Sequence, residues 1–461
     1  MKSSFNIEKF RNMFIQNDRM EEIHIMPEGA LIYRANSEMA EKLMEYNMFR
    51  IDSCYRDILL DGFRGKNLEN LINTYGEKNV SSKISHAYFN NLIDFRENIS
   101  KINVKVIGSK NAFYPPHMAI ELTDICNLSC KHCYRQAGYK GKYIDFKKLK
   151  EIILQMKEKG LKLVEVTGGE PTLHPQFSQI IQFLCDNLSL VAILTNGTNI
   201  TDEMMEVFEK NKGKIMVNIS LDSSSAEFHD KFRGKKGAWE TTVHSLKKIS
   251  DIPILTRVAM SIVPDNMFDI ERTIKVAQEN GAKSFAWEVS NTNGRGSNIS
   301  WNKVSEKRYE NFVKESKYLQ AKYHEMITFI PPKCTKKMQQ GCDNCGAGWR
   351  TFALDPYGEL RTCVNGDNNM FRFGNIFAEG IKIFQKPIMS ELSKIGVPRY
   401  ETCKSCKNFS YCQGCFIKGI DGALHNPECT WEGKKLLQFV DKEKYRGNNV
   451  EKCITQRSLR H

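Results

Sequence analysis

The sequence predicts an α/β protein of 461 residues whose core is a partial (β/α)6 barrel. From residue 117, short apolar segments typical of strands alternate with longer amphipathic segments typical of helices. Motifs rich in Gly, Ser, Asn and Asp follow the ends of these strands. After residue 334 the cysteines become dense. We therefore expect parallel βαβ units with right-handed crossovers, followed by a loop-rich C-terminal domain.

Composition places the chain among globular proteins, with 41% hydrophobic and 26% charged residues. No apolar run approaches the roughly 20 residues of a membrane helix, and the N-terminus lacks an export signal. We expect a cytoplasmic protein with no membrane partner, whose 15 cysteines stay reduced and bind metal. The net charge of +13 comes from dispersed Lys and Arg. This pattern favours a solvated basic face over a nucleic-acid site.

Residues 1–108 predict a small α+β domain. A hairpin is expected at 22–35, a helix at 37–46 and three short helices within 55–95. This pattern resembles the winged-helix-like recognition element of enzymes that modify ribosomally made peptides. The resemblance implies that the domain binds a leader peptide, which pairs with an edge of its sheet as an additional strand. An ordinary N-terminal cap on the barrel is the alternative.

Residues 109–290 predict the barrel. Strands are expected at 117–122, 163–167, 191–194, 215–221, 255–262 and 284–288. Helices are expected at 146–159, 177–186, 202–210, 239–249 and 267–280. A linker at 291–333 contains one helix at 305–323. The cysteine-rich domain spans 334–445, with a closing helix at 432–444, and residues 446–461 form a tail.

Cys126, Cys130 and Cys133 follow the first barrel strand, in the run Glu-Leu-Thr-Asp-Ile-Cys-Asn-Leu-Ser-Cys-Lys-His-Cys-Tyr-Arg. Three thiolates can bind three irons of a four-iron cluster and leave one iron open for another ligand. A zinc site with His132 as the fourth ligand is the alternative. The spacing favours the cluster, because zinc sites usually pair Cys-x-x-Cys with a second, distant pair.

The other unusual residues lie where strands end, which is where parallel barrels bind ligands. Gly168 and Gly169 allow close approach of a ligand to the backbone, and Glu170 can accept a hydrogen bond from an amine. Ser220 and Asp222 can bind hydroxyl groups.

Further candidates are Asn196 after the third strand, Arg233 after the fourth, Arg257 on the fifth and Glu288 at the end of the sixth. Either arginine can hold a carboxylate with two hydrogen bonds. Taken singly, each residue could belong to a turn, a helix cap or a charged surface. Their occurrence at successive strand ends indicates one site.

The order of these motifs over residues 115–290 resembles the radical S-adenosylmethionine (radical SAM) enzymes. The resemblance implies that SAM chelates the open iron, with Gly168–Glu170 at its amino group. Residues of the fourth and fifth strands would bind its ribose and carboxylate. It also implies that a donor such as flavodoxin or ferredoxin supplies an electron. SAM then yields a 5′-deoxyadenosyl radical that takes a hydrogen atom from the substrate. His132 departs from the family, which often has another aromatic residue there.

The later cysteines resemble the SPASM module, which binds two auxiliary 4Fe-4S clusters, for three clusters in all. The spacing departs slightly, with two residues instead of three between the last close pair. The resemblance implies that one cluster is bound by Cys403, Cys406, Cys412 and Cys429. The other would be bound by Cys345, Cys363 and Cys415, completed by Cys342 or Cys334. A pair of zinc ribbons is the alternative, although ribbons usually separate their pairs further.

The SPASM module recurs in enzymes that modify peptides. The resemblance implies an enzyme that forms a thioether or carbon–carbon cross-link in a ribosomally made precursor peptide with a leader. A sulfatase-maturing enzyme is the second hypothesis. That group has an Asp after the cysteine that matches Cys363, whereas this chain has Val364 and Asn365. A non-catalytic iron–sulfur electron carrier is the third, but it would not need the strand-end motifs.

Overall fold

The computed structural model describes residues 5–18, 20–34, 48–99, 104–290, 294–327, 344–366, 370–371, 373–406, 409–412 and 414–440. These residues form two compact units. The first runs to Tyr114 and includes Glu158–Gly160, and the second contains the rest.

The first unit combines two small sheets with three helices. Strand β1 (Phe14–Asn17) pairs with β5 (Ile93–Arg96), and a four-stranded sheet has the order β4-β3-β2-β6. The strands of the larger sheet are β2 (Met20–Met26), β3 (Gly29–Arg34), β4 (Met48–Asp52) and β6 (Lys105–Gly108). The helices are α1 (Ser53–Phe63), α2 (Leu68–Tyr75) and α3 (Glu77–Phe89).

The predicted hairpin and three helices are therefore present. Asp52 and Asn67 begin α1 and α2 by accepting hydrogen bonds from Tyr55 N and Asn70 N, as N-cap residues do. The predicted helix at 37–46 lies outside the described residues. The prediction missed that β4 and β6 enlarge the hairpin into a sheet, because each is too short to show clear alternation.

The second unit contains an eight-stranded sheet of order β12-β11-β10-β9-β8-β7-β13-β14. Six consecutive strands of this sheet are parallel neighbours in chain order, as the barrel prediction requires. They are β7 (His117–Glu121), β8 (Leu163–Thr167), β9 (Leu190–Thr195), β10 (Ile215–Ser220), β11 (Leu255–Ile262) and β12 (Ser284–Val289).

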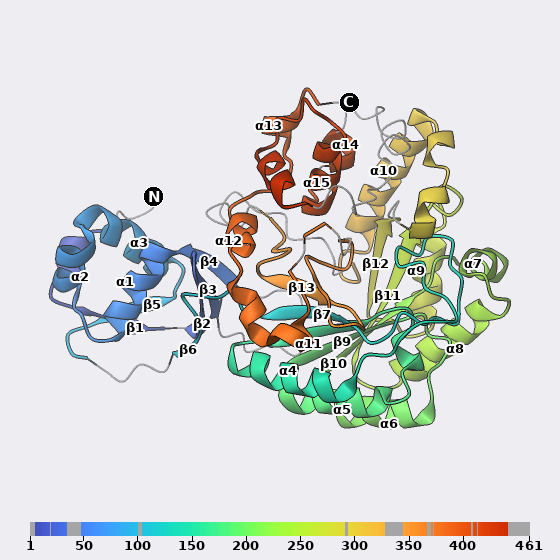
Figure 1. Ribbon diagram of the computed structural model, residues 1–461, viewed down its shortest axis with the longest axis horizontal. Coiled ribbons are helices and arrows are strands. Elements are labelled where there is room, and N and C mark those ends of the chain that lie inside the picture. Colours follow the sequence, from blue (N-terminus) through green and yellow to red (C-terminus); the bar gives the residue numbers. More distant parts are fainter. Residues whose placement is uncertain are drawn as a thin grey trace. The chain divides into compact units, whose positions relative to one another are not determined.

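Helices connect these strands, and α4, α5 and α6 run along one face of the sheet (Figure 1). Each of the five helices predicted for the barrel is present: α4 (Phe146–Glu158), α5 (Phe177–Asn187), α6 (Asp202–Lys210), α8 (Ala238–Ser250) and α9 (Ile270–Glu279). In α4 the buried positions Phe146, Leu149, Ile153 and Met156 recur at helical spacing and form one apolar face. The α/β class and the partial barrel are confirmed.

Two features were missed. The segment Ala226–Arg233 forms a further helix, α7, whose Ser225 cap and left-handed Gly234 mark its two ends. Strand β13 (Thr351–Leu354) pairs in parallel with β7, and β14 (Leu360–Arg361) pairs with β13. The cysteine-rich region therefore contributes two strands to the barrel sheet. Such short strands carry too few residues for a periodic signal.

The remaining elements are short, apart from α10 (Glu306–Lys322). They are η1 (Ile7–Phe10), η2 (Pro171–Leu173), η3 (Gly294–Asn298), η4 (Trp301–Lys303), α11 (Ile376–Glu379), η6 (Gly380–Gln385), α12 (Ile388–Ser393), α13 (Tyr400–Cys403), α14 (Phe409–Cys412), α15 (Phe416–Leu424) and η7 (Glu432–Phe439). The closing helix predicted at 432–444 is present as the 3-10 helix η7. Residues 441–444 of that prediction lie outside the described residues. Within the described chain, no helix combines the length and apolarity needed to cross a membrane.

Candidate functional site

The loop after β7 brings the first three predicted thiols together. Cys126 and Cys130 are buried, Cys133 is half-buried, and all three belong to one small packed cluster. Cys126 N donates to Gly138 O at 2.7 Å, which closes the loop on itself. We call residues 122–138 the cysteine loop.

Helix α7 supports the cysteine loop through its C-terminal carbonyls. Ser129 N donates to Arg233 O at 3.1 Å, and Lys131 N donates to Phe232 O at 2.9 Å. Carbonyls at a helix end have no partner within the helix, so they are free to accept these bonds. Sequence reasoning missed a second support, Arg295, whose guanidinium donates to the carbonyls of Cys130 and Ala137. No local pattern links residues so distant in sequence.

Gly168 and Gly169 are required by the cysteine loop itself. A Cβ at Gly168, which has φ +142°, would lie 2.3 Å from Thr123 O. A Cβ at Gly169 would lie 2.2 Å from Ile125 O. Backbone bonds hold this contact, because Gly169 N and Glu170 N donate to Thr123 O and Ile125 O. The glycine pair therefore allows β8 to lie directly against the backbone that carries Cys126.

Gly169→Ala should displace the cysteine loop without unfolding the protein. The added methyl overlaps Ile125 O, and overpacking of this kind costs about 1–3 kcal/mol. We expect the reconstituted variant to lose about a third of its iron, that of one cluster in three. The matched control is Gly213→Ala, where a Cβ would meet nothing within 4 Å. Equal iron content in the two purified variants would contradict this account.

Glu170 joins the ends of β8 and β9 in a network that reaches Cys126. The carboxylate is buried and accepts hydrogen bonds from Thr172, from Thr195 Oγ1 at 2.7 Å and from Asn196 N at 2.7 Å. Burial raises the pKa of Glu170, although these bonds act in the opposite direction. The amide of Asn196 in turn donates to Asn127 Oδ1 and lies 4.0 Å from Cys126 Sγ. Both predicted residues therefore belong to one network that orients the cysteine loop.

Asp222 and Arg233 form a second network, which reaches Cys130. Arg233 Nε donates to Asp222 Oδ2 at 2.6 Å, and Arg233 Nη1 donates to Cys130 Sγ at 3.7 Å. Burial acts to raise the pKa of Asp222, but the charge of Arg233, together with His132, His229 and a hydrogen bond from Ser261 N, keeps that pKa below its ordinary value. A buried cation therefore faces the Cys130 sulfur, where it stabilises negative charge.

The other three candidates lie away from these networks. Arg257, on β11, donates from Nε to Asn218 Oδ1 at 3.2 Å. Burial lowers its pKa, and the charges of Glu165 and Glu288 oppose that change. Arg257 and Glu288 therefore interact electrostatically, because β11 and β12 are neighbouring strands. Ser220 is half-buried at the end of β10.

A buried ion-pair cluster connects the cysteine loop with the strand before Cys363. Glu121, at the end of β7, pairs with Arg135 of the cysteine loop at 3.0 Å and with Arg361 of β14. Glu121 and Arg361 are almost fully buried. Arg361 also donates to the carbonyl of Gly366, beyond Cys363. Sequence reasoning placed Glu121 in a strand and gave it no role.

The described C-terminal thiols fall into two groups. Burial raises the pKa of Cys363 to about 12, and the neighbouring thiols Cys345 and Cys415 add to that rise. Burial likewise raises the pKa of Cys412, which interacts with a separate set of thiols, Cys403, Cys406 and Cys429. Cys334 and Cys342 lie outside the described residues.

These thiols fit iron–sulfur clusters by their chemistry. Cluster sulfurs accept hydrogen bonds and are tuned by nearby donors. Here Arg233 and Asn196 face the sulfurs of Cys130 and Cys126, and Asn426 Nδ2 lies 3.4 Å from Cys406 Sγ. Among the described residues, no three His, Cys, Asp or Glu side chains form a site for a single metal ion. A cluster differs from such a site, because each of its thiolates binds a different iron.

Iron removal should loosen the C-terminal part more than the barrel. The described residues between 399 and 431 form short helices, and metal binding in such segments supplies folding free energy. We expect chelation under anaerobic conditions to speed amide hydrogen exchange there by at least tenfold. Exchange in α5 and β9, which lie in the barrel core, should stay unchanged. Equal exchange in the C-terminal segment before and after chelation would contradict this prediction.

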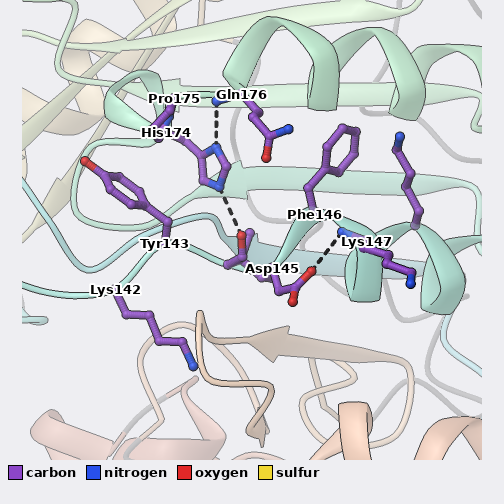
Figure 2. Close-up of a pocket in the computed structure, with 10 residues that line it drawn as sticks. Lys142, Tyr143, Asp145, Phe146, Lys147, His174, Pro175 and Gln176 are labelled. Carbon is purple, nitrogen blue, oxygen red and sulfur yellow. Dashed lines mark hydrogen bonds between the residues drawn. The ribbon is translucent and has the colours of Figure 1, made fainter.

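A separate cavity of about 660 Å³ lies at the starts of α4 and α5 (Figure 2). The His174 ring spans its wall, accepting from Gln176 N at Nδ1 and donating from Nε2 to Ile144 O. Burial lowers the pKa of His174, which keeps the ring neutral in this role. Lys142, Lys147 and Lys150 give the cavity a basic lining.

Comparison with known proteins identifies the family. Residues 120–277 match the model of the radical SAM superfamily, and residues 345–407 match the SPASM iron–sulfur cluster-binding domain. The chain is 30% identical over 440 residues to the antilisterial bacteriocin subtilosin biosynthesis protein AlbA of Bacillus subtilis. That alignment covers 91% of this chain and 96% of AlbA.

The chain belongs to the radical SAM superfamily.

Other radical SAM relatives agree with this assignment. The mycofactocin maturase MftC of Mycolicibacterium smegmatis is 26% identical over 71% of this chain and 86% of its own length. Among solved structures, Streptococcus suis SuiB bound to S-adenosylmethionine has a TM-score of 0.60 at 13% identity. The match covers 88% of this chain and 96% of SuiB, and it shows a shared fold.

Family membership confirms several predictions made from the sequence. The chain is a radical SAM enzyme, and its cofactors are SAM, a 4Fe-4S cluster and the auxiliary iron–sulfur clusters of a SPASM domain. An electron carrier without catalytic activity is therefore excluded.

The structure also explains the departure at His132. Burial lowers the pKa of this ring to about 4, so it stays neutral and stacks on Phe232 like any other aromatic residue.

Proposed function

We propose that this chain modifies a ribosomally made precursor peptide by forming a thioether or carbon–carbon cross-link. The observation that carries the proposal is the 30% identity to AlbA, a bacteriocin biosynthesis protein, along 91% of the chain. This range includes most of the N-terminal unit as well as the barrel. A sulfatase-maturing activity is less well supported, because Val364 and Asn365 follow Cys363 where that group has an acidic residue.

We propose that Cys126, Cys130 and Cys133 bind the cluster that takes SAM. When bound, this cluster and SAM together supply the radical that removes a hydrogen atom from the substrate. The protein orients the thiols through Asn196 and the Arg233–Asp222 pair and keeps them buried. Gly168–Glu170, which follow β8, and the half-buried Ser220, which ends β10, would line the SAM site from the same edge of the sheet. Arg257, on β11, and Glu288, exposed near the end of β12, would contribute from the next two strands.

We propose that the two C-terminal thiol groups bind the auxiliary clusters. Cys403, Cys406, Cys412 and Cys429 supply four ligands for one cluster. Cys345, Cys363 and Cys415 supply three for the other, which Cys342 or Cys334 would complete. On this proposal the barrel spans 109–290, the linker 291–333, the SPASM domain 334–445 and the tail 446–461.

We propose that residues 1–108 form a domain that binds the leader of the precursor. Strands β4 and β6 form the two edges of its four-stranded sheet, and an extended peptide can pair with such an edge. Val106, on β6, is 48% exposed despite its apolar side chain. The solved structure of SuiB bound to its precursor peptide SuiA, with a TM-score of 0.59, supports a peptide partner. A cytoplasmic location completes the proposal, because every described cysteine is a free thiol.

Co-expression with a candidate precursor tests this function. The gene should be expressed anaerobically beside a short neighbouring open reading frame that encodes a peptide, and the product weighed by mass spectrometry. We expect a loss of two hydrogen atoms for each cross-link. An unchanged peptide mass, together with SAM cleavage by the same preparation, would contradict peptide cross-linking. Conversion of a Cys or Ser to formylglycine would favour the sulfatase-maturing alternative.

A further inference from the structure

A basic groove of about 720 Å³ lies beside the cysteine loop. It is lined by Ser129 and Lys131 of that loop, by α7, and by the segments that follow β11 and β12. The basic side chains that line it outnumber the acidic ones by five to one: Lys131, Lys231, Arg295, Lys303 and Arg308 against Asp265.

The charges of this groove divide into a structural and an exposed set. Arg295 donates to two carbonyls of the cysteine loop, and Arg308 donates to Pro264 O at 2.9 Å. The three lysines, Lys131, Lys231 and Lys303, are exposed to solvent. A concave surface of one charge sign concentrates its field and speeds association with oppositely charged partners.

Stacked rings connect this groove with the thiols. Phe228 and Phe232 line the groove, and their ring centroids are 5.6 Å apart. Phe232 then stacks on His132 at 4.7 Å with an interplanar angle of 8°. His132 lies between Cys130 and Cys133 in sequence. The groove is therefore separated from the proposed cluster site by closely packed rings.

We propose that this groove is the docking surface for an acidic protein that donates electrons to the cluster of the cysteine loop. The inference rests on the proposed function, in which that cluster must be reduced. One electron leaves the donor, which is oxidised, and enters the cluster, which is reduced, and no protein bond forms or breaks. The charge of the groove selects an acidic partner. Its position beside the cysteine loop favours an electron donor over an acidic peptide or a nucleic acid, which have no need to approach the cluster from this side.

The variant Lys231→Glu/Lys303→Glu tests the proposal in the cluster-loaded full chain. The probe is an acidic flavodoxin, with binding measured by titration calorimetry and cluster reduction followed by stopped-flow spectroscopy. We expect the flavodoxin Kd to rise and the reduction rate to fall by about tenfold, because like charges now face each other. Reduction by dithionite, which needs no docking surface, should keep its rate.

The matched control is Lys147→Glu/Lys148→Glu. These lysines begin α4, and Lys147 lines the separate cavity of Figure 2, so the variant makes the same change in net charge elsewhere. We expect its flavodoxin affinity to stay within twofold of the wild type. An equal loss of affinity in both variants, or no loss in either, would overturn the proposal. A selective loss of affinity for the precursor peptide or for RNA in the Lys231→Glu/Lys303→Glu variant would also overturn it. A failure of the proposed function gives a different result: the wild-type protein, reduced with dithionite, would form no 5′-deoxyadenosine.

Discussion

Replacement of Glu121 with glutamine should destabilise the barrel by about 3–5 kcal/mol, the usual effect of breaking a buried ion pair. The carboxylate pairs with Arg361 and with Arg135 and has almost no solvent contact. Burial acts to lower the pKa of Arg361, but the charge of Glu121 and the hydrogen bond to it, with smaller contributions from Tyr134 and Asp355, together raise that pKa. The neutral amide would leave two arginines, one of them deeply buried, without an opposing charge. Urea unfolding, monitored by intrinsic tryptophan fluorescence, measures the change in the free energy of unfolding.

The matched control for this variant is Glu209→Gln. Glu209 pairs with Lys212 at 2.8 Å, but both side chains are about half exposed. Exposed pairs contribute about 0–1 kcal/mol, so this change should be small. If the two variants unfold at the same urea concentration, Glu121 has no special role. A Glu121 variant that keeps its stability but loses iron would show that the ion pairs act on the cysteine loop alone.

Cys412→Ala should abolish cross-linking while SAM cleavage continues. The thiol belongs to the group of Cys403, Cys406 and Cys429, which is distinct from the cysteine loop. Gly422 lies so close that an added Cβ would be 2.3 Å from Cys412 Sγ, which indicates a tightly defined position. We expect the variant to lose about a third of its iron and to form less than about 1% of the cross-linked peptide. Its 5′-deoxyadenosine yield should remain within about threefold of the wild type.

Cys185→Ala is the control for the removal of a buried thiol. Cys185 packs in α5, where burial raises its pKa to about 12, and it belongs to none of the three thiol groups. We expect normal iron content and normal cross-linking, with a small loss of stability. Full cross-linking by Cys412→Ala would contradict a role for this auxiliary cluster.

Much of the barrel could be predicted from the sequence because its strands and helices are long enough to show their periods. The six strands from β7 to β12 and the five expected helices are present. The strands β13 and β14 could not be predicted, because β13 is stabilised by pairing with β7, which is more than 200 residues away, and β14 pairs only with β13 among the described strands. Helix α7 was missed because Arg233 was assigned only to the end of the fourth strand and the eight residues Ala226–Arg233 give a short periodic signal.

The candidate site was predicted as a set of residue types but not as a set of contacts. Arg233 and Asp222 were each expected to bind SAM, whereas the structure pairs them with each other and directs Arg233 to Cys130. Gly168 and Gly169 were expected to allow close approach of a ligand, and the structure adds that a Cβ at either position would overlap the backbone of the cysteine loop. Contacts of this kind depend on which strand ends lie side by side. A linear sequence does not state them, and neither Arg295 nor Arg361 carries a local signal.

The formation of 5′-deoxyadenosine from SAM tests the central claim most directly. The reconstituted protein, reduced with dithionite under anaerobic conditions, should produce 5′-deoxyadenosine and methionine in equal amounts. The triple variant Cys126→Ala/Cys130→Ala/Cys133→Ala should produce none, while it keeps the iron of the two auxiliary clusters. A triple variant that cleaves SAM at the wild-type rate would contradict the assignment of these thiols. A fully loaded wild-type protein that never cleaves SAM would contradict the account as a whole.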